Sequence, residues 1–294
     1  MSDHSTREEN WDLEIHAKKP VFGLDLKELI RYKDLIQLFV KRDFISIYKQ
    51  TILGPLWIIL QPALITITYT IIFGRVANLS TDGMPALVFY LAGVTVWAYF
   101  ADCVIKTSDT FIVNQNIFGK VYFPRLVVPL SIITTNLIKF FIQLGLFLLV
   151  YAVFIIFELK DAENMTFSLT GLALLPVVIF IMMCLGMGLG LIISAMTTKY
   201  RDLRFLVQFG IQLAMFAAPV VYPMSIAPES SLTYKIIKCN PMTGVIETFK
   251  YIFFGNDSML DIPWLMYSLG TSIVLLFLGL FLFNRVERSF MDTI

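Results

Sequence analysis

Basic residues gather on one side of the helix that the sequence predicts for residues 26–49. On a helical wheel, the basic arc consists of Lys27, Arg31, Lys41, Arg42 and Lys49, and most apolar residues fall on the opposite arc. Such a helix lies in a membrane interface, where its cations can bind lipid headgroups or a phosphorylated ligand. We therefore predict an amphipathic interface helix over residues 25–51, with "RYKD" as a possible break. An ordinary juxtamembrane helix that obeys the positive-inside rule is the alternative.

Asp102, Lys106 and Lys139 are ionisable residues inside or at the edge of long apolar runs. Charges in a hydrocarbon region are costly and are therefore functional candidates. Asp102 and Lys106 are four residues apart on one helical face, so we expect them to pair. Lys139 lies near the middle of its run, where snorkelling or a hydrogen bond to a neighbouring span would accommodate it.

Aromatic residues form a narrow stripe along the fifth apolar run. The stripe consists of Phe205, Phe209, Gln212 and Phe216 and ends near Tyr222. Aromatic faces can stack against sugar rings in a pore, but packing or lipid contact is at least as common at helical spacing. We assign these residues, with Tyr69 of the first run, to a candidate substrate path.

Several classes of chemistry lack the residues that they need. The sequence has no GxxxxGK[ST] phosphate loop, and its two histidines lie near the N-terminus. Its three cysteines have no metal-ligand spacing, and its formal net charge of +1 argues against a nucleic-acid partner. We therefore expect no catalytic residue, no metal site and no cofactor in this chain.

The composition is that of a membrane protein. Hydrophobic residues make up 57% of the 294 residues and charged residues 15%, against about 45–50% and 25% in soluble domains. Apolar runs of about 20 residues or more predict an all-α integral membrane protein with six spans. We place these spans at 53–74, 84–105, 126–157, 169–196, 205–222 and 263–284.

The distribution of lysine and arginine predicts the orientation. Most of these residues fall in the N-terminal segment and in the loops on the same side, which puts both termini in the cytoplasm. The resulting organisation is a cytoplasmic tail at 1–24, the interface helix, and a membrane domain at 52–294. Residues 223–262 form the last outer loop, where we expect two short re-entrant helices broken at Asn240–Pro241. A small extramembrane cap is the alternative.

Three short features predict local geometry. Gly54–Pro55 allows a sharp turn between the interface helix and the first span. Pro62 leaves a backbone carbonyl that lipid cannot satisfy, so this part of the span should contact protein or a cavity. The GxxxG pair Gly186–Gly190 permits close approach of another helix.

The cytoplasmic segment 107–123 is unusually apolar for a loop. It places Phe111, Ile112, Ile117 and Phe118 where water would contact them unless something covers them. We predict that the segment docks a partner protein. A helix that lies back on the protein's own cytoplasmic face is the alternative.

Four segments of the chain resemble a known family, in the family's order. They are "RDFISIYKQTILGPLWIILQPALITITYTIIFGRVA", "NIFGKVYFPRLVVPLS", "YRDLRFLVQFGIQLAMFAAPVVYPMS" and "NPMTGVIETFKY". The chain resembles the permease subunits of ABC transporters that export polysaccharides, polyol phosphates and teichoic acids. The resemblance covers about residues 34–255.

The resemblance implies a homodimeric permease of the bacterial cytoplasmic membrane that works with a separate ATPase. That ATPase subunit would bind ATP and magnesium, and the substrate would be a polymer on a polyprenyl diphosphate, such as O-antigen, capsule or teichoic acid. The family's coupling helix maps here onto residues 108–118, with Ser108, Phe111, Asn114, Ile117 and Phe118 as its contacts. Lys41, Arg42 and Lys49 would then bind the lipid diphosphate.

Two other functions remain open. An exporter of a small lipid or drug would share the fold without needing a channel as wide as a polymer. An ion-coupled secondary transporter would need Lys139 in its coupling site, and the sparse intramembrane acids argue against it.

Overall fold

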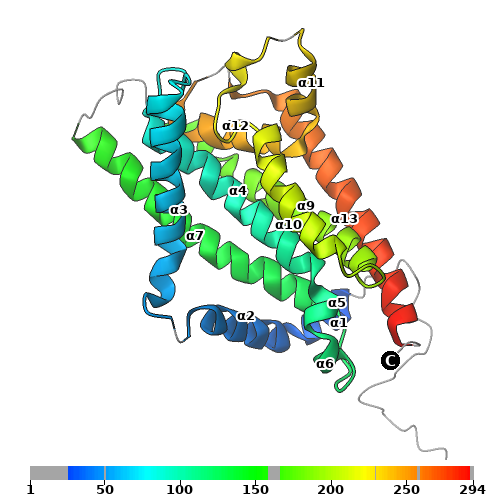
Figure 1. Ribbon diagram of the computed structural model, residues 1–294. Coiled ribbons are helices and arrows are strands. Elements are labelled where there is room, and N and C mark those ends of the chain that lie inside the picture. Colours follow the sequence, from blue (N-terminus) through cyan, green and yellow to red (C-terminus); the bar gives the residue numbers. More distant parts are fainter. Residues whose placement is uncertain (1–25, 50, 158–165, 229, 257–258, 292–294) are drawn as a thin grey trace, which may run out of the picture.

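The computed structural model describes residues 26–49, 51–157, 166–228, 230–256 and 259–291, and the predicted tail at 1–24 lies outside this part (Figure 1). Within the described residues, every regular element is helical, as predicted. The α-helices are α1 Leu26–Arg31, α2 Lys33–Tyr48, α3 Trp57–Tyr69, α4 Ala86–Ser108, α5 Thr110–Val113, α6 Gln115–Phe118, α7 Val127–Ile156, α8 Leu169–Leu172, α9 Leu175–Thr197, α10 Leu203–Ala214, α11 Leu232–Cys239, α12 Pro241–Phe254 and α13 Ile262–Met291.

Five helical segments of the described chain are long and apolar enough to cross a membrane. They are Gly54–Val76, Ala86–Ser108, Val127–Ile156, Leu175–Thr197 and Ile262–Glu287. The remaining expected span, at 205–222, is a helical segment of Leu203–Ala217 followed by a turn at 218–220. At 1.5 Å per residue, about 15 helical residues cover only about 22 Å of a hydrocarbon core of about 30 Å. The number of six spans therefore stays a prediction.

Glycines of α9 let it pack tightly between two other spans. A Cβ atom on Gly186 would lie 2.6 Å from Cys103 Cβ of α4, and one on Gly190 would lie 2.5 Å from Thr107 Cβ. On another side of α9, a Cβ on Gly188 would lie 2.7 Å from the backbone of Leu275 in α13. The close approach predicted from the GxxxG pair is thus confirmed, and α4 is the partner.

Replacing Gly190 with alanine should destabilise the protein by about 1–3 kcal/mol, because its new methyl group overlaps Thr107. The matched control is Gly145→Ala on α7, where the Cβ would meet nothing within 4 Å. This second change should cost nothing, since alanine is the better helix former. Melting temperatures in one detergent compare the two variants, and equal values would contradict the packing argument.

The N-terminal helices lie across one end of the bundle, below α3 and α7 (Figure 1). They are separated at Tyr32, within the predicted "RYKD" break. Gly54 has a φ of 52°, in the left-handed region that favours glycine, and Pro55 follows at the start of a short 3-10 helix. This turn connects α2 to the steeply oriented α3, which is the geometry predicted for Gly54–Pro55 (Figure 1).

The segment that the sequence predicts to be an outer loop consists of α11 and α12, which meet at Asn240. The Asn240 side chain accepts a hydrogen bond from the Met242 amide and caps α12, whose first residue is Pro241. Both helices lie at the end of the bundle opposite α2 (Figure 1). Most of α12 is buried against α4, α9 and α13. Insertion of these helices into the outer leaflet stays a prediction.

Candidate functional site

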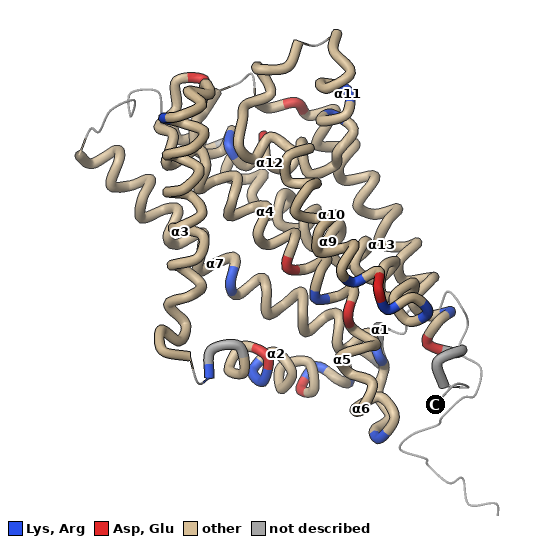
Figure 2. The backbone as a smooth tube through the Cα atoms, in the orientation of Figure 1, with Lys and Arg blue, Asp and Glu red and all other residues tan. Residues whose placement is uncertain are grey.

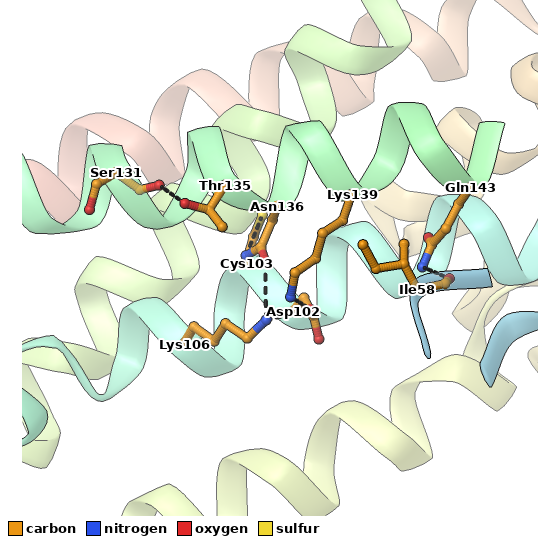
Figure 3. A network of polar contacts seen from close by, with 9 residues as sticks. All are labelled: Ile58, Asp102, Cys103, Lys106, Ser131, Thr135, Asn136, Lys139 and Gln143. Atoms are coloured by element: carbon orange, nitrogen blue, oxygen red, sulfur yellow. Dashed lines mark hydrogen bonds and ion pairs between the residues drawn. The ribbon is translucent and has the colours of Figure 1, made fainter. Parts of the chain in front are cut away.

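Two neighbouring spans share a polar network in the half of the bundle nearer α2. Lys106 Nζ donates hydrogen bonds to Asp102 Oδ2 at 2.6 Å and to Asn136 Oδ1 of α7 at 3.1 Å. Lys139 Nζ of α7 lies 3.6 Å from the same Asp102 oxygen (Figure 3). The predicted Asp102–Lys106 pair is confirmed. Lys139 joins that pair from the next helix, so an ion pair between spans explains it.

A second polar contact replaces the backbone hydrogen bond that Pro62 removes from α3. Proline has no N–H group, so the carbonyl of Ile58, four residues earlier, cannot accept the usual helical hydrogen bond. Gln143 of α7 donates to this oxygen from Nε2 at 3.4 Å (Figure 3). Pro62 itself is buried. The prediction that this part of the span contacts protein is therefore confirmed.

The predicted phosphate ligands of α2 occupy different surroundings. Lys41, Arg42 and Lys49 all have exposed side chains. Arg42 also ion-pairs with Asp43 at 2.7 Å, and its guanidinium lies 4.5 Å from the centre of the Phe39 ring. Of these three cations, Arg42 is the one that lines a pocket between α2 and the spans.

An aromatic cluster joins the segment after α4 to α2 and α13. The Phe111 ring lies 5.9 Å from Phe118 and stacks on Phe283 of α13 at 4.6 Å, measured between centroids. Phe118 lies 5.7 Å from Phe123, which in turn lies 5.7 Å from Phe39 of α2. This chain of rings connects the predicted coupling segment to α2, the predicted interface helix.

The Arg125 guanidinium completes this cluster. It lies 5.3 Å from the centre of the Phe118 ring, and its Nη1 donates to the Glu287 carbonyl at 3.1 Å. Burial lowers the Arg125 pKa and the nearby Glu287 carboxylate opposes that shift. Close by, burial raises the pKa of the Asp109 carboxyl above its usual value. The Arg204 guanidinium, 3.7 Å away, partly opposes this shift.

The five predicted coupling residues therefore differ in their exposure to solvent. Phe111 is 1% exposed and Phe118 6%, and Ser108 and Asn114 are also buried, whereas Ile117 is partly exposed. The expectation that the phenylalanines need a partner to cover them is wrong, because Phe123, Phe283 and Arg125 of this chain do so. The alternative, a segment lying back on the protein's own surface, holds for these side chains. The exposed residues of the segment are Val113, Gln115, Asn116, Gly119, Lys120, Val121 and Tyr122.

The aromatic stripe of α10 lies on the surface of the chain. Phe205, Phe209, Gln212 and Phe216 are exposed. Tyr222 is half-buried and donates to the Phe216 carbonyl at 2.7 Å, while the Tyr69 hydroxyl lies 3.7 Å from Met215 Sδ. The six residues thus belong to one region around α10. Their role in a substrate path stays a prediction.

A buried ion pair on α12 escaped the sequence reasoning, which placed Lys250 in an outer loop. The Lys250 side chain is fully buried, and its Nζ donates to the Pro219 carbonyl at 2.6 Å. It lies 3.7 Å from Glu247 Oε1 and 3.7 Å from the centre of the Phe89 ring. Two opposite charges three residues apart in the apolar run "PMTGVIETFKYIFF" were the signal for it.

Charges are sparse on the spans and gather at one end of the molecule. Figure 2 shows most of the basic and acidic residues on α2, around the start of α10 and at the nearby end of α13, and fewer at the opposite end, around α11 and α12. The α5 and α6 helices and the C-terminal part of α13 lie at this same end (Figure 1). The interface helix, the predicted coupling segment and most of the charge therefore share one side of the bundle.

Comparison with known proteins supplies the family context. Residues 34–254 match the family model "ABC-2 type transporter". The chain is 28% identical over 269 residues to the O-antigen export system permease protein RfbA of Myxococcus xanthus. The alignment covers 92% of this chain and 98% of the RfbA chain. It is 28% identical to the RfbA permease of Klebsiella pneumoniae, over 88% of this chain and 94% of that one. It is 20% identical to the polysialic acid transport protein KpsM of Escherichia coli, over 82% and 89% of the two chains.

Proposed function

Because this chain belongs to the ABC-2 type transporter family, we propose that it forms the membrane path of an ATP-driven exporter of lipid-linked polysaccharide. It is a multi-pass permease, the transporter component of such a system, and its relatives are named for O-antigen export and polysialic acid transport. The observation that carries the proposal is the likeness to O-antigen export permeases over nearly the whole chain. The substrate we propose is a polymer attached to a polyprenyl diphosphate, of the O-antigen, capsule or teichoic-acid type.

The energy would come from a separate ABC ATPase subunit, which would bind ATP and magnesium. Its docking surface on this chain would be the exposed part of the coupling segment. Val113 is 68% exposed, Val121 59% and Tyr122 52%, and the helices of this segment, α5 and α6, lie on the side of the bundle that carries α2. Exposed apolar side chains of this kind support an interface with a partner. Motion of the segment would reach α2 through the buried phenylalanine cluster.

A second copy of the chain would complete the path. The exposed apolar residues of the helical segment Leu203–Ala217, which consists of α10 and the 3-10 turn after it, include Phe205, Leu206, Phe209, Leu213 and Phe216. In a homodimer, part of this surface would face the other subunit and part the polymer, whose sugar rings can stack on aromatic side chains. The complex would lie in the bacterial cytoplasmic membrane with both termini in the cytoplasm, consistent with the charges gathered around α2.

Replacing Val121 with glutamate and Tyr122 with alanine should weaken the ATPase complex, because a charge and a lost ring disrupt an apolar interface. We expect ATP-dependent movement of lipid-linked glycan into proteoliposomes to fall at least tenfold, with the stimulation of the ATPase by the permease falling alongside it. Arg75→Gln, an exposed change in the π-helical segment Thr70–Val76 that continues α3, is the control.

Transport in proteoliposomes that lack the ATPase would contradict the proposed mechanism and favour an ion-coupled transporter. Depletion of the protein in cells separates the remaining alternatives. Accumulation of lipid-linked glycan on the cytoplasmic side is expected for a polymer exporter. An unchanged glycan pool would instead favour an exporter of a small lipid or drug.

A further inference from the structure

Helix α10 is attached to the rest of the chain differently from the five long spans, each of which has buried residues. None of the residues of α10 is buried, and the helix packs on the hydrophobic core through partly buried side chains such as Val207 and Ile211. Beyond its C-terminal end, the chain is held by hydrogen bonds that Asn240 and Lys250 donate to its carbonyl groups. A helix with so little buried surface shifts at a smaller cost than a buried span does.

The N-terminal turn of α10 contacts the predicted coupling segment through an ion pair. Arg204 Nη2 of α10 lies 3.7 Å from Oδ2 of Asp109, the residue between α4 and α5. The phenylalanine cluster connects the same segment to α2 and α13. The ion pair therefore gives the segment a separate and direct connection to α10.

This ion pair is longer than the geometry that such pairs prefer. In a bidentate Arg–carboxylate pair, two parallel N–H···O bonds have lengths of about 2.7–2.9 Å. Among the described residues, Asp109 Oδ1 and Arg204 Nε are both buried and have no hydrogen-bond partner. They are the second acceptor and the second donor that a bidentate pair uses, since Nε and Nη2 lie on one edge of the guanidinium. A relative shift of about 1 Å converts the contact into a bidentate pair.

Burial favours that shift. The Asp109 side chain is only 14% exposed, and burial raises the pKa of its carboxyl although Arg204 opposes the change. A buried polar atom without a hydrogen bond is costly, and the bidentate pair removes two of them. The Arg204 side chain is 38% exposed, and its guanidinium lies 5.6 Å from the centre of the Phe205 ring. The contact thus has a loose form and a bidentate form, as a switch between two states requires.

Two other cations line a pocket together with Asp109, but each has a carboxylate of its own. Arg42 pairs with Asp43, and Lys106 pairs with Asp102. The guanidinium of α10 is therefore the cation that an ion pair assigns to the Asp109 carboxylate.

We propose that Arg204 and Asp109 position α10 according to the state of the coupling segment, by closure of their loose ion pair into a bidentate one. The inference rests on the proposed function, since an ATPase moves the segment. Closure draws the start of α10 toward the turn between α4 and α5, while Asn240 and Lys250 hold the chain after the helix. The exposed aromatic stripe tilts with the helix. Arg204 and Asp109 are thus positioning residues for the predicted substrate path.

The full-length chain, reconstituted with its ATPase in proteoliposomes, tests the proposal. The readout is the amount of lipid-linked glycan moved per ATP hydrolysed. Arg204→Gln and Asp109→Asn should each lower this ratio about five- to tenfold, because neither variant can form the charged bidentate pair. Their melting temperatures should stay within about 2 °C of the native value, since a long and partly exposed pair adds little stability. Arg201→Gln, an exposed charge change three residues earlier, should leave both quantities unchanged.

Arg204→Lys distinguishes a pair that closes from one that is static. Lysine keeps the positive charge but has no planar fork, so it preserves a simple ion pair and prevents bidentate closure. The ratio of glycan moved to ATP hydrolysed should therefore fall nearly as far in Arg204→Lys as in Arg204→Gln. A native ratio in Arg204→Lys would overturn the proposal, because charge alone would then suffice.

The double variant Arg204→Gln with Asp109→Asn tests whether the two residues act through each other. It should be no worse than either single variant, since all three lack the same contact. Losses that multiply in the double variant would overturn the proposal, because the two residues would then act separately. Melting temperatures that fall in step with the ratio would also overturn it, by indicating a merely structural pair.

Two outcomes separate this inference from the proposed function. A native ratio in Arg204→Gln, with export still dependent on the ATPase, overturns the inference and leaves the proposed function standing. Export that continues in proteoliposomes without the ATPase overturns the proposed function itself, whatever the variants show.

Discussion

Among the charged residues that the structure describes, Lys250 is the one whose replacement by methionine is expected to destabilise the protein most. The ammonium is buried, and it binds the Pro219 carbonyl and compensates Glu247. Methionine fills a similar volume but leaves a buried carboxylate and a buried carbonyl without their cation. Breaking a buried pair from one side costs about 3–5 kcal/mol, which corresponds to a fall in melting temperature of roughly 10 °C.

The matched control for Lys250→Met is Lys235→Met on α11, where the lysine is exposed. It should melt within about 1–2 °C of the native protein, because exposed substitutions cost little. The double variant Lys250→Met with Glu247→Gln should melt above the single one, since it removes the unpaired charge as well. A double variant that is no more stable than the single would contradict the charge argument.

Lys250 also links α12 to the chain that follows α10. Its acceptor, Pro219, lies just after the helical segment that ends at Ala217, and Asn240 Nδ2 donates to the Ala217 carbonyl at 3.1 Å. The chain from 218 to 221 is buried, and its Val220 backbone lies against Gly93 of α4. The C-terminal end of α10 is therefore fixed to α12 and α4. We expect Lys250→Met to reduce export as well as stability, through loss of this attachment.

Replacing Phe111 with alanine should be the most damaging change in the coupling segment. The side chain is 1% exposed and packs against Phe118 and Phe283. Removing a buried phenylalanine ring costs about 3–5 kcal/mol through lost burial and the cavity left behind. The cluster that joins the segment to α2 and α13 would lose its central ring. The expected result is a lower melting temperature together with ATP hydrolysis that no longer drives export.

Two further variants separate packing from docking at this place. Phe111→Leu keeps apolar volume and should recover part of both stability and export. Val113→Ala removes an exposed side chain and should leave the melting temperature unchanged while weakening association with the ATPase. A Phe111→Ala protein that melts like the native chain and still exports would show that the cluster has no coupling role.

The sequence determined the features that depend on neighbours along the chain. Apolar run lengths located the five long spans, and Gly54–Pro55 and Asn240–Pro241 located the turn and the break between helices. The Asp102–Lys106 pair followed from their spacing of four residues on one helix. These features are set by backbone preferences and by one helical period, so distant parts of the chain are not needed to predict them.

The tertiary structure decided which side of each helix is covered, and by what. Lys139 meets Asp102 because α7 lies beside α4, and Gln143 reaches the Ile58 carbonyl because α7 also lies beside α3. Phe111 faces inward because Phe283, far along the chain, stacks on it. Hydropathy cannot distinguish a phenylalanine that a partner protein covers from one that is buried within its own chain. The same apolar surface is removed from water in both cases. That choice depends on where the spans pack, which local spacing does not specify.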